Sequence, residues 1–146
     1  MPEKQGIASF GTTSPSERVT KFREKDVLVS NIRPYFKKLW FATTSGGCNA
    51  DVLCFRALDS QYSYLLKSIM YQDGFFDYVM SGAKGTKMPR GDKNHIMLYP
   101  IPCFTDEQLK EFNALARLIE IKQAQNRQEM SHLENLKQVV LVTLSR

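Results

Sequence analysis

Residues 75–103 read FFDYVMSGAKGTKMPRGDKNHIMLYPIPC, and this stretch joins two chemically different parts of the chain. Its middle, residues 81–92, holds three glycines with Lys84, Lys87 and Arg90 between them and few apolar residues. Such a segment cannot bury itself, because Lys and Arg stay in solvent unless they are paired. The pattern predicts an exposed basic loop. It is either a mobile surface loop or a segment that presents cations and donors to phosphate.

The chain before this loop carries the strand signals. Residues 26–32 (DVLVSNI) form a β-branched run that ends at a proline, which predicts a mostly buried strand. Residues 38–42 (KLWFA) predict a strand whose leucine and phenylalanine share one face, with the tryptophan on the other. Residues 51–56 (DVLCFR) predict a further strand, and the Ser-Gly-Gly of residues 45–47 predicts a turn.

Helical spacing of apolar residues follows the strands. Residues 61–70 and 74–80 each repeat apolar side chains at the spacing of a helix, with one face for the core. After the basic loop, residues 92–97 predict one helical turn capped by Asp92, and residues 98–101 predict a short strand. The polar residues 1–16 predict a loosely ordered arm, with at most a strand at 7–10.

The clearest local signal is the start of a long C-terminal helix. Thr105 and Gln108 have the spacing of a capping box, so we expect the helix to begin at Asp106. No glycine or proline follows Pro102, and forty helical residues would span about 60 Å. The apolar stripe that we expect to meet a partner helix comprises Leu109, Phe112, Ala116, Ile119, Met130, Leu133, Val140 and Leu144. Either the helix bends back near residues 123–128 or it pairs with a second copy.

The order of these elements predicts an α+β protein with a small mixed sheet, short helices and one long C-terminal helix. We expect a domain at residues 1–103 and the helix at residues 104–146. The net charge of +5 indicates an anionic partner. No apolar run is long enough for a membrane span, and the polar start MPEKQG lacks the apolar core of a signal peptide, so we expect a cytoplasmic protein without membrane contact.

The cysteines and histidines do not predict a metal site. Cys48, Cys54 and Cys103 fit neither a zinc knuckle nor a redox pair, so we expect reduced thiols with at least two near the core. His95 and His132 have no second ligand nearby in sequence, and we interpret both as ordinary histidines. We also find no catalytic arrangement, no phosphate-binding loop of nucleotide enzymes and no cofactor site, so we expect a protein without chemistry of its own.

A second basic segment follows the first predicted strand. Arg33, Lys37 and Lys38 alternate with aromatic residues, namely Tyr35, Phe36, Trp40 and Phe41. Nucleic-acid surfaces combine cations for phosphate with rings for stacking or packing. We expect the rings to pack in the core, and we expect Arg33 and Lys37 to contact phosphate.

Residues 27–42 (VLVSNIRPYFKKLWFA) and 80–102 (MSGAKGTKMPRGDKNHIMLYPIP), followed by the long helix, resemble the target recognition domain of DNA-specificity subunits in type I restriction-modification systems. The residues Gly46, Gly47, Asp51 and Arg56 match a further segment of that family. The family has glycine where this chain has Lys25. Its complete domain also carries an earlier segment that is absent here, as in a fragment, a truncated product or a half-sized variant. The resemblance covers most of residues 18–146.

The resemblance implies a module that reads half of a bipartite double-stranded DNA target. It also implies separate methyltransferase (modification) and restriction subunits as partners, with the helix as spacer and as the surface for self-association or a second recognition domain. The expected DNA-binding residues are Arg33, Lys37, Lys38, Lys84, Thr86, Lys87, Arg90, Lys93 and Asn94. The alternative is a basic oligomerising scaffold or RNA-binding protein in which the helix acts and the loop is passive.

Overall fold

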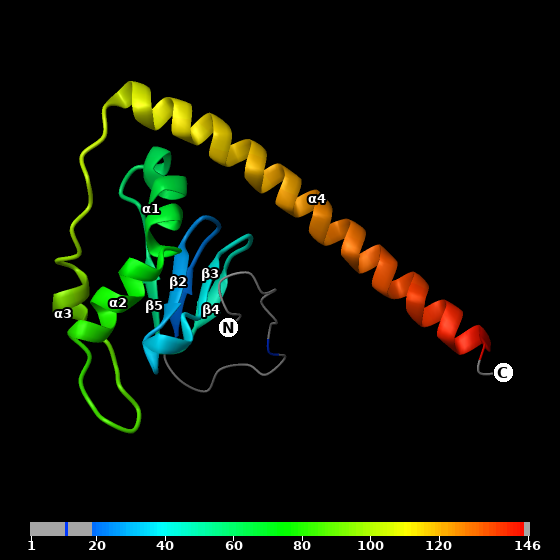
Figure 1. Cartoon of the computed structure of the whole chain (residues 1–146), viewed down its shortest axis with the longest axis horizontal. Helices are drawn as coiled ribbons and strands as arrows, with labels where there is room; N and C mark the ends of the chain where they lie inside the picture. Colours follow the sequence, from blue (N-terminus) through cyan, green and yellow to red (C-terminus); the bar gives the residue numbers. More distant parts are fainter. Residues whose placement is uncertain (1–10, 12–18, 145–146) are drawn as a thin grey trace. The chain divides into compact units, whose positions relative to one another are not determined.

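The computed structural model describes Gly11 and residues 19–144 (Figure 1). The architecture is α+β, as predicted, with two small antiparallel sheets, short helices and a long C-terminal helix. The chain divides into two compact units, Met1–Thr105 and Asp106–Arg146. The predicted arm at residues 1–16, with its strand at 7–10, lies outside the described residues apart from Gly11.

A three-stranded antiparallel sheet forms the centre of the first unit. Strand β2 (Val27–Ser30) lies between β3 (Leu39–Phe41) and β5 (Val52–Phe55). In this register Leu28 stands opposite both Trp40 and Cys54. The three strands confirm the predictions for residues 26–32, 38–42 and 51–56, with ends shortened by one or two residues.

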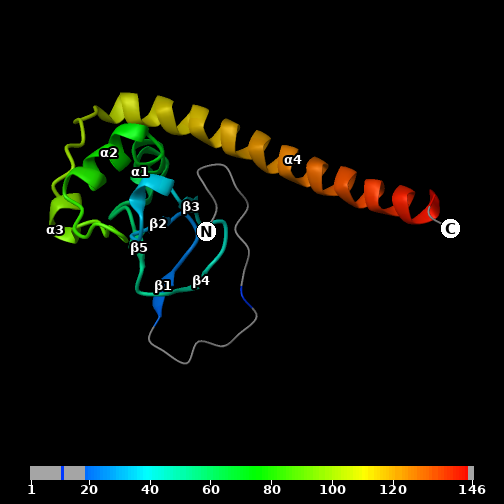
Figure 2. The same ribbon diagram turned by 60° about the horizontal axis from the view of Figure 1, so that its bottom comes forward.

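Strand β2 is buried on both faces, which explains its nearly continuous apolar sequence. Val27 and Val29 join a cluster with Phe75, Phe76 and other helical residues. Leu28 points the other way, into a smaller cluster with Phe22. The first unit therefore has three layers: short helices, the central sheet and a two-stranded ribbon (Figure 2).

The ribbon pairs β1 (Thr20–Phe22) with β4 (Gly46–Cys48) in antiparallel fashion. This corrects the prediction of a turn at residues 45–47, because both glycines lie in a strand. A Cβ atom at Gly46 would stand 2.8 Å from Cζ of Phe22, so glycine leaves the space that the ring occupies. The pairing partner lies too far away in sequence for a local pattern to indicate it.

The helices match their predicted positions closely. Residues 61–70 divide into a 3-10 turn, η2 (Ser60–Tyr62), and the helix α1 (Ser63–Met70), so Tyr62 is exposed and does not share the core face that we expected. Helix α2 (Asp73–Ser81) follows. The single-turn helix α3 (Lys93–Ile96) begins at the predicted cap.

The strand predicted at residues 98–101 does not form. The amides of Leu98 and Tyr99 donate to the carbonyl oxygens of His95 and Ile96, at 3.0 and 3.1 Å, and this continues the turn after α3. Pro100 and Pro102 have no N–H to donate to a neighbouring strand. The segment therefore runs as irregular chain to the last helix.

The second unit consists of helix α4, which runs without interruption from Asp106 to Leu144 and begins at the predicted residue. Its continuity excludes the hairpin bend near residues 123–128. The first three residues of the predicted apolar stripe, Leu109, Phe112 and Ala116, lie in the first three turns of α4. The remaining five are exposed: Ile119, Met130, Leu133, Val140 and Leu144. Among the described residues no helix combines the length and apolar composition of a membrane span.

Candidate nucleic-acid interface

The two basic segments predicted from sequence lie side by side. The amide of Arg33 donates to the carbonyl oxygen of Pro89 at 2.8 Å, and the amide of Gly91 donates to the carbonyl oxygen of Asn31 at 3.3 Å. Ile32 and Arg90 form an isolated antiparallel bridge between these contacts. The basic loop is thus tied to the chain that leaves β2.

The basic loop itself is closed by its own backbone. Lys84 and Arg90 exchange two hydrogen bonds of 2.9 Å between their main-chain groups. Gly85 has a φ of 97°, a conformation that glycine adopts without strain. The loop projects between α2 and α3 (Figure 1). These bonds give the backbone of the loop a closed conformation.

Two buried polar atoms lie where the loop meets the sheet. Nε of Arg33 and Oδ1 of Asn31 are buried and have no hydrogen-bond partner within the described part of the chain. A Cβ atom at Gly91 would stand 2.9 Å from Oδ1 of Asn31, so the loop backbone passes close to this amide. Unsatisfied buried groups are uncommon in folded proteins, and two of them lie beside the basic loop.

Three predicted DNA-binding cations already have carboxylate partners on the surface. Lys37 pairs with Asp73 at 2.6 Å, Lys84 with Asp92 at 2.6 Å, and Arg90 with Asp51 at 3.1 Å. The hydrogen bond that Lys37 donates to Asp73 raises the pKa of Lys37, and the one that Lys84 donates to Asp92 raises the pKa of Lys84. Both lysines stay charged at neutral pH, and the side chains of all three residues are partly open to solvent.

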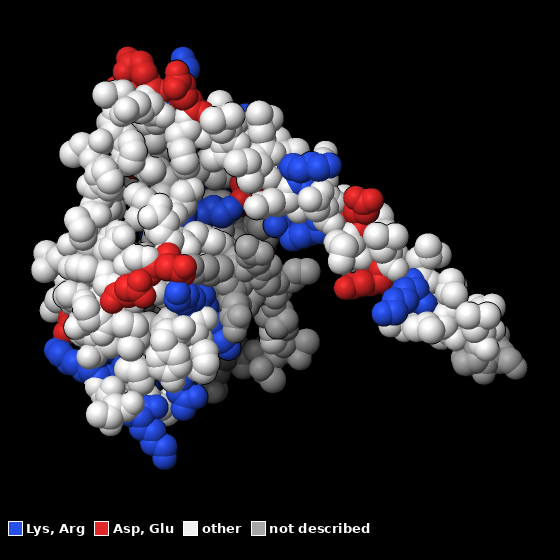
Figure 3. All heavy atoms as spheres, in the orientation of Figure 1, with Lys and Arg blue, Asp and Glu red and all other residues white. Residues whose placement is uncertain are grey.

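The remaining predicted residues are exposed or half-buried around the same loop. Thr86, Lys87, Lys93 and Asn94 are exposed, and Lys38 is half-buried with its Nζ 5.8 Å from the ring centroid of Phe36. Figure 3 shows that Lys and Arg side chains gather at the end of the first unit where the α2–α3 loop projects. The structure therefore brings the two basic segments onto one surface.

The aromatic residues of the first basic segment divide into two groups. Phe41 is buried and Trp40 is half-buried, as expected for core residues. The expectation was wrong for Tyr35 and Phe36, which are 46% and 44% exposed. They lie in a 3-10 turn, η1 (Pro34–Phe36), which buries its proline and turns the two rings outward.

An ion pair with a buried carboxylate lies at the start of β2, and sequence analysis did not find it. Asp26 is 2% exposed and accepts hydrogen bonds from Nε and Nη2 of the exposed Arg56, at 2.8 and 2.6 Å. Burial opposes ionisation, but these bonds and those from the Arg23 amide and the Cys54 thiol lower the pKa of Asp26 overall. The pair joins the start of β2 to the end of β5, so its role is structural.

His95 lies against Tyr78 of α2, and two of the three cysteines lie next to the core, as predicted for the cysteines. The ring of His95 stacks on Tyr78 with centroids 4.2 Å apart, and its Nε2 lies 3.0 Å from the Tyr78 carbonyl oxygen. All three cysteines are free; Cys48 and Cys54 are half-buried and pack against the core. In the described part, no three His, Cys, Asp or Glu side chains lie close enough to share a metal ion.

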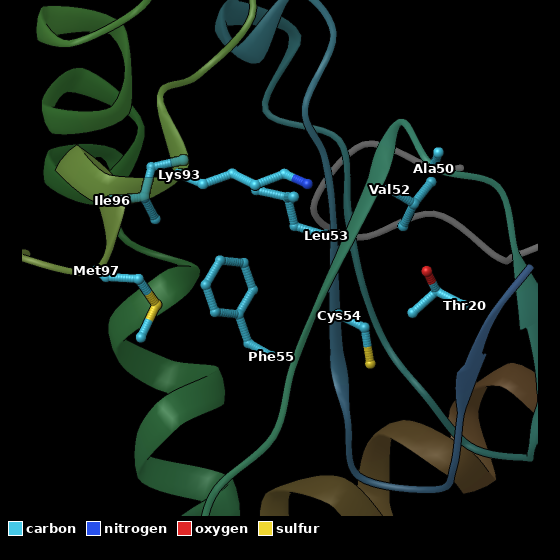
Figure 4. Close-up of a pocket in the computed structure, with 9 residues that line it drawn as sticks. All are labelled: Thr20, Ala50, Val52, Leu53, Cys54, Phe55, Lys93, Ile96 and Met97. Carbon is cyan, nitrogen blue, oxygen red and sulfur yellow. The ribbon is translucent and has the colours of Figure 1, made fainter.

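A cavity of about 420 Å³ opens beside β5, away from the residues predicted to bind DNA apart from Lys93 (Figure 4). Its walls are largely apolar, and Phe55, Ile96 and Met97 form one side. Thr20 and Lys93 supply its polar groups. This lining suits an apolar group and contains no acid–base pair for catalysis.

The chain was compared with known proteins by sequence. No protein-family model matches it, and no curated protein matches it. The candidate interface therefore has to be judged from its own geometry.

Proposed function

We propose that the chain is a sequence-specific double-stranded DNA recognition module of a type I restriction-modification system. It reads half of a bipartite target in the cytoplasm and directs separate methyltransferase and restriction subunits, without catalysis of its own. The single observation that carries the proposal is the backbone pairing of residues 31–33 with residues 89–91, which places two basic segments on one surface.

The backbone at Lys25 supports the resemblance on which the family assignment rests. Lys25 has a φ of 68°, in the left-handed region that favours glycine. Glycine is the residue that the family has at this position. The turn before β2 thus keeps the glycine conformation although the side chain has changed.

The ion pairs of the surface are compatible with phosphate binding. Exposed pairs contribute little net stability because solvent screens them. Phosphate oxygens therefore compete readily with Asp73 and Asp92 for the two lysines. A guanidinium such as that of Arg90 can form two parallel hydrogen bonds with guanine, and Asn94 can do the same with adenine. We assign phosphate contacts to Lys37, Lys38 and Lys84, and base contacts to Thr86, Lys87, Arg90 and Asn94.

Selection of random duplex DNA by the purified chain at near-physiological salt tests the proposal. Sequencing of the bound fraction should reveal enrichment of a short motif. An absence of enrichment, with affinity that falls uniformly as salt rises, would show phosphate contact alone and contradict sequence recognition. A matched pool of single-stranded RNA serves as the control for class of nucleic acid.

The exposed apolar residues of α4 favour a second candidate, a basic oligomerising scaffold or RNA-binding protein. Deletion of the loop would also remove the contacts of Pro89 and Gly91 with β2, so substitution is the better discriminator. The triple variant Lys84→Gln, Lys87→Gln, Arg90→Gln keeps the loop backbone. If this variant binds nucleic acid as well as the wild type and oligomerises normally, the scaffold is favoured.

A further inference from the structure

The outward-facing rings of Tyr35 and Phe36 are the feature of the basic surface that phosphate binding does not explain. Their centroids lie 4.6 Å apart, and the ring planes are tilted by 54°. Each ring is nearly half exposed, although aromatic side chains of a small domain normally contribute to its core. The two rings form one exposed apolar surface within a segment of cations.

The turn that presents the rings is held in an unusual conformation. Arg33 and Lys37, at its two ends, have φ values of 49° and 50°, in the left-handed region that non-glycine residues rarely adopt. The amide of Lys37 donates to the carbonyl oxygen of Pro34 at 2.8 Å, which closes the turn. Such conformations persist where the surroundings enforce them, and they cluster at functional sites.

Contacts on several sides brace the turn. Pro34 is fully buried, Arg33 is bonded to Pro89 of the basic loop, and Lys37 pairs with Asp73 at the start of α2. The rings are therefore presented on a supported base. Ordering them on binding costs less entropy than ordering rings on a flexible loop would.

The charges around the rings indicate the chemistry of the ligand. Arg33, Lys37 and Lys38 flank the pair, and Nζ of Lys38 lies 5.8 Å from the Phe36 ring centroid. A ligand that satisfies both features presents phosphates beside flat apolar faces. Nucleic acid does so wherever a base is exposed from its stack, and apolar side chains of DNA-bending proteins occupy such steps.

We propose that Tyr35 and Phe36 insert at a base step of duplex DNA, where they partly unstack two neighbouring base pairs while the flanking cations hold the phosphates. The inference rests on the proposed function and specifies how that surface contacts DNA. Shape and deformability of the contacted step then contribute to recognition, in addition to base-edge contacts from the basic loop.

The test compares binding to an intact duplex with binding to the same duplex carrying one central mismatch. A mismatch lowers the cost of unstacking, so the wild type should bind the mismatched duplex about tenfold more tightly. The double variant Tyr35→Ala, Phe36→Ala should bind both duplexes alike. Tyr62→Ala, which removes a ring of similar exposure from η2, should keep the wild-type preference.

A second measurement uses the wild type alone and does not depend on the folding of a variant. A 2-aminopurine base at the contacted step should fluoresce more strongly on binding, because it leaves the stack. Equal binding of both duplexes, with unchanged fluorescence, would overturn the insertion and leave duplex recognition intact. If the wild type binds neither duplex, both proposals are overturned.

Anionic phospholipid vesicles provide the remaining arm, because aromatic rings beside lysines also suit a membrane surface. The insertion proposal requires that the double variant lose affinity for duplex DNA and that the wild type not prefer vesicles. Vesicle binding that depends on Tyr35 and Phe36, without an effect on DNA, would overturn it.

Discussion

The main-chain amide of Arg33 donates a 2.8 Å hydrogen bond to the carbonyl oxygen of Pro89. This bond links the chain just after the central strand to the basic loop. The sequence separation of the two residues is more than half of the described length of the first unit. Because it uses backbone groups, its formation does not depend on the charged side chains at either position. The basic side chains can therefore be changed singly without removing the contact between the two segments.

Arg90 and Lys37 should differ in what their removal does to DNA binding. Arg90→Ala should lower affinity for the selected motif about tenfold or more and relax specificity at one position, because a base contact is lost. Lys37→Ala should weaken all duplexes alike and reduce the salt slope by less than one, because Asp73 takes up a cation when DNA displaces it from Lys37. Titration of cognate and scrambled duplexes over a range of salt measures both. Equal effects of the two substitutions on specificity would remove the base-reading role from Arg90.

Gly82 should not tolerate a side chain, whereas Gly74 should. A Cβ atom at Gly82 would stand 2.2 Å from Cδ2 of His95 and displace the ring from Tyr78. We expect Gly82→Ala to lower the free energy of unfolding by about 1–3 kcal/mol. Gly74 lies in the first turn of α2 with its nearest neighbour at 3.8 Å, so Gly74→Ala should be neutral or stabilising. Denaturant unfolding of both variants checks this, and equal destabilisation would contradict the crowding at His95.

Asp26 should contribute stability that is lost in acid. Its folded-state pKa is lowered from 3.8, so the contribution is complete above that value and is lost as the pH falls through the folded-state pKa. We expect Asp26→Asn to cost about 2 kcal/mol at neutral pH. The difference between wild type and variant should shrink below about pH 4. A difference that stays constant in denaturant melts across this range would contradict the assignment.

The three thiols should differ in reactivity. Cys103 is exposed, whereas burial raises the pKa of Cys48 and, with the hydrogen bond to Asp26, raises the pKa of Cys54 to about 11. At about pH 8 an alkylating reagent should modify Cys103 first, since the thiolate is the reactive species. Mass spectrometry of timed samples identifies the site. Cys103→Ser should abolish the fast phase, and rapid labelling of Cys54 in the folded chain would contradict the prediction.

The exposed apolar residues of α4 should drive association. Replacement of Leu133 and Val140 by glutamate should shift the chain toward monomer in sedimentation equilibrium, because both side chains are about half exposed in the single chain. The double variant Gln128→Glu, Gln138→Glu adds the same charge at two exposed polar positions and serves as the control. The thermal midpoint of the wild type should also rise with concentration. A wild type that stays monomeric at high concentration would contradict self-association.

Local patterns predicted the elements that carry their own signals. The β-branched run at residues 26–32 ends at a proline, and Thr105 with Gln108 marks a helix start, so both elements appear where expected. The cap at Asp92 likewise holds the first turn of α3, where its carboxylate accepts from the amide of Asn94 at 2.9 Å. In each case the stabilising groups lie within a few residues of one another.

The features that sequence analysis predicted wrongly or did not predict depend on contacts between residues that are distant in sequence. Gly46 and Gly47 looked like a turn because nothing nearby indicates that Phe22 would fill the space above Gly46. The partnership of Asp26 with Arg56 depends on the register of β2 against β5. Tyr35 and Phe36 were expected in the core because the left-handed residues that turn them outward are not glycines. Local sequence patterns likewise do not indicate that the two basic segments are adjacent, because this contact joins residues that are distant in sequence.

Because Asp51, Asp73 and Asp92 are each paired with a basic side chain, DNA must replace a carboxylate at each of these three cations. When DNA takes the side chain of Lys37, Lys84 or Arg90, the displaced carboxylate is left with a charge that draws a cation from solution. This cation uptake opposes the counterion release that accompanies every phosphate contact. The salt dependence of binding should therefore be shallower than the number of contacts implies, and weak polyanions with sparse charge should fail to displace the carboxylates.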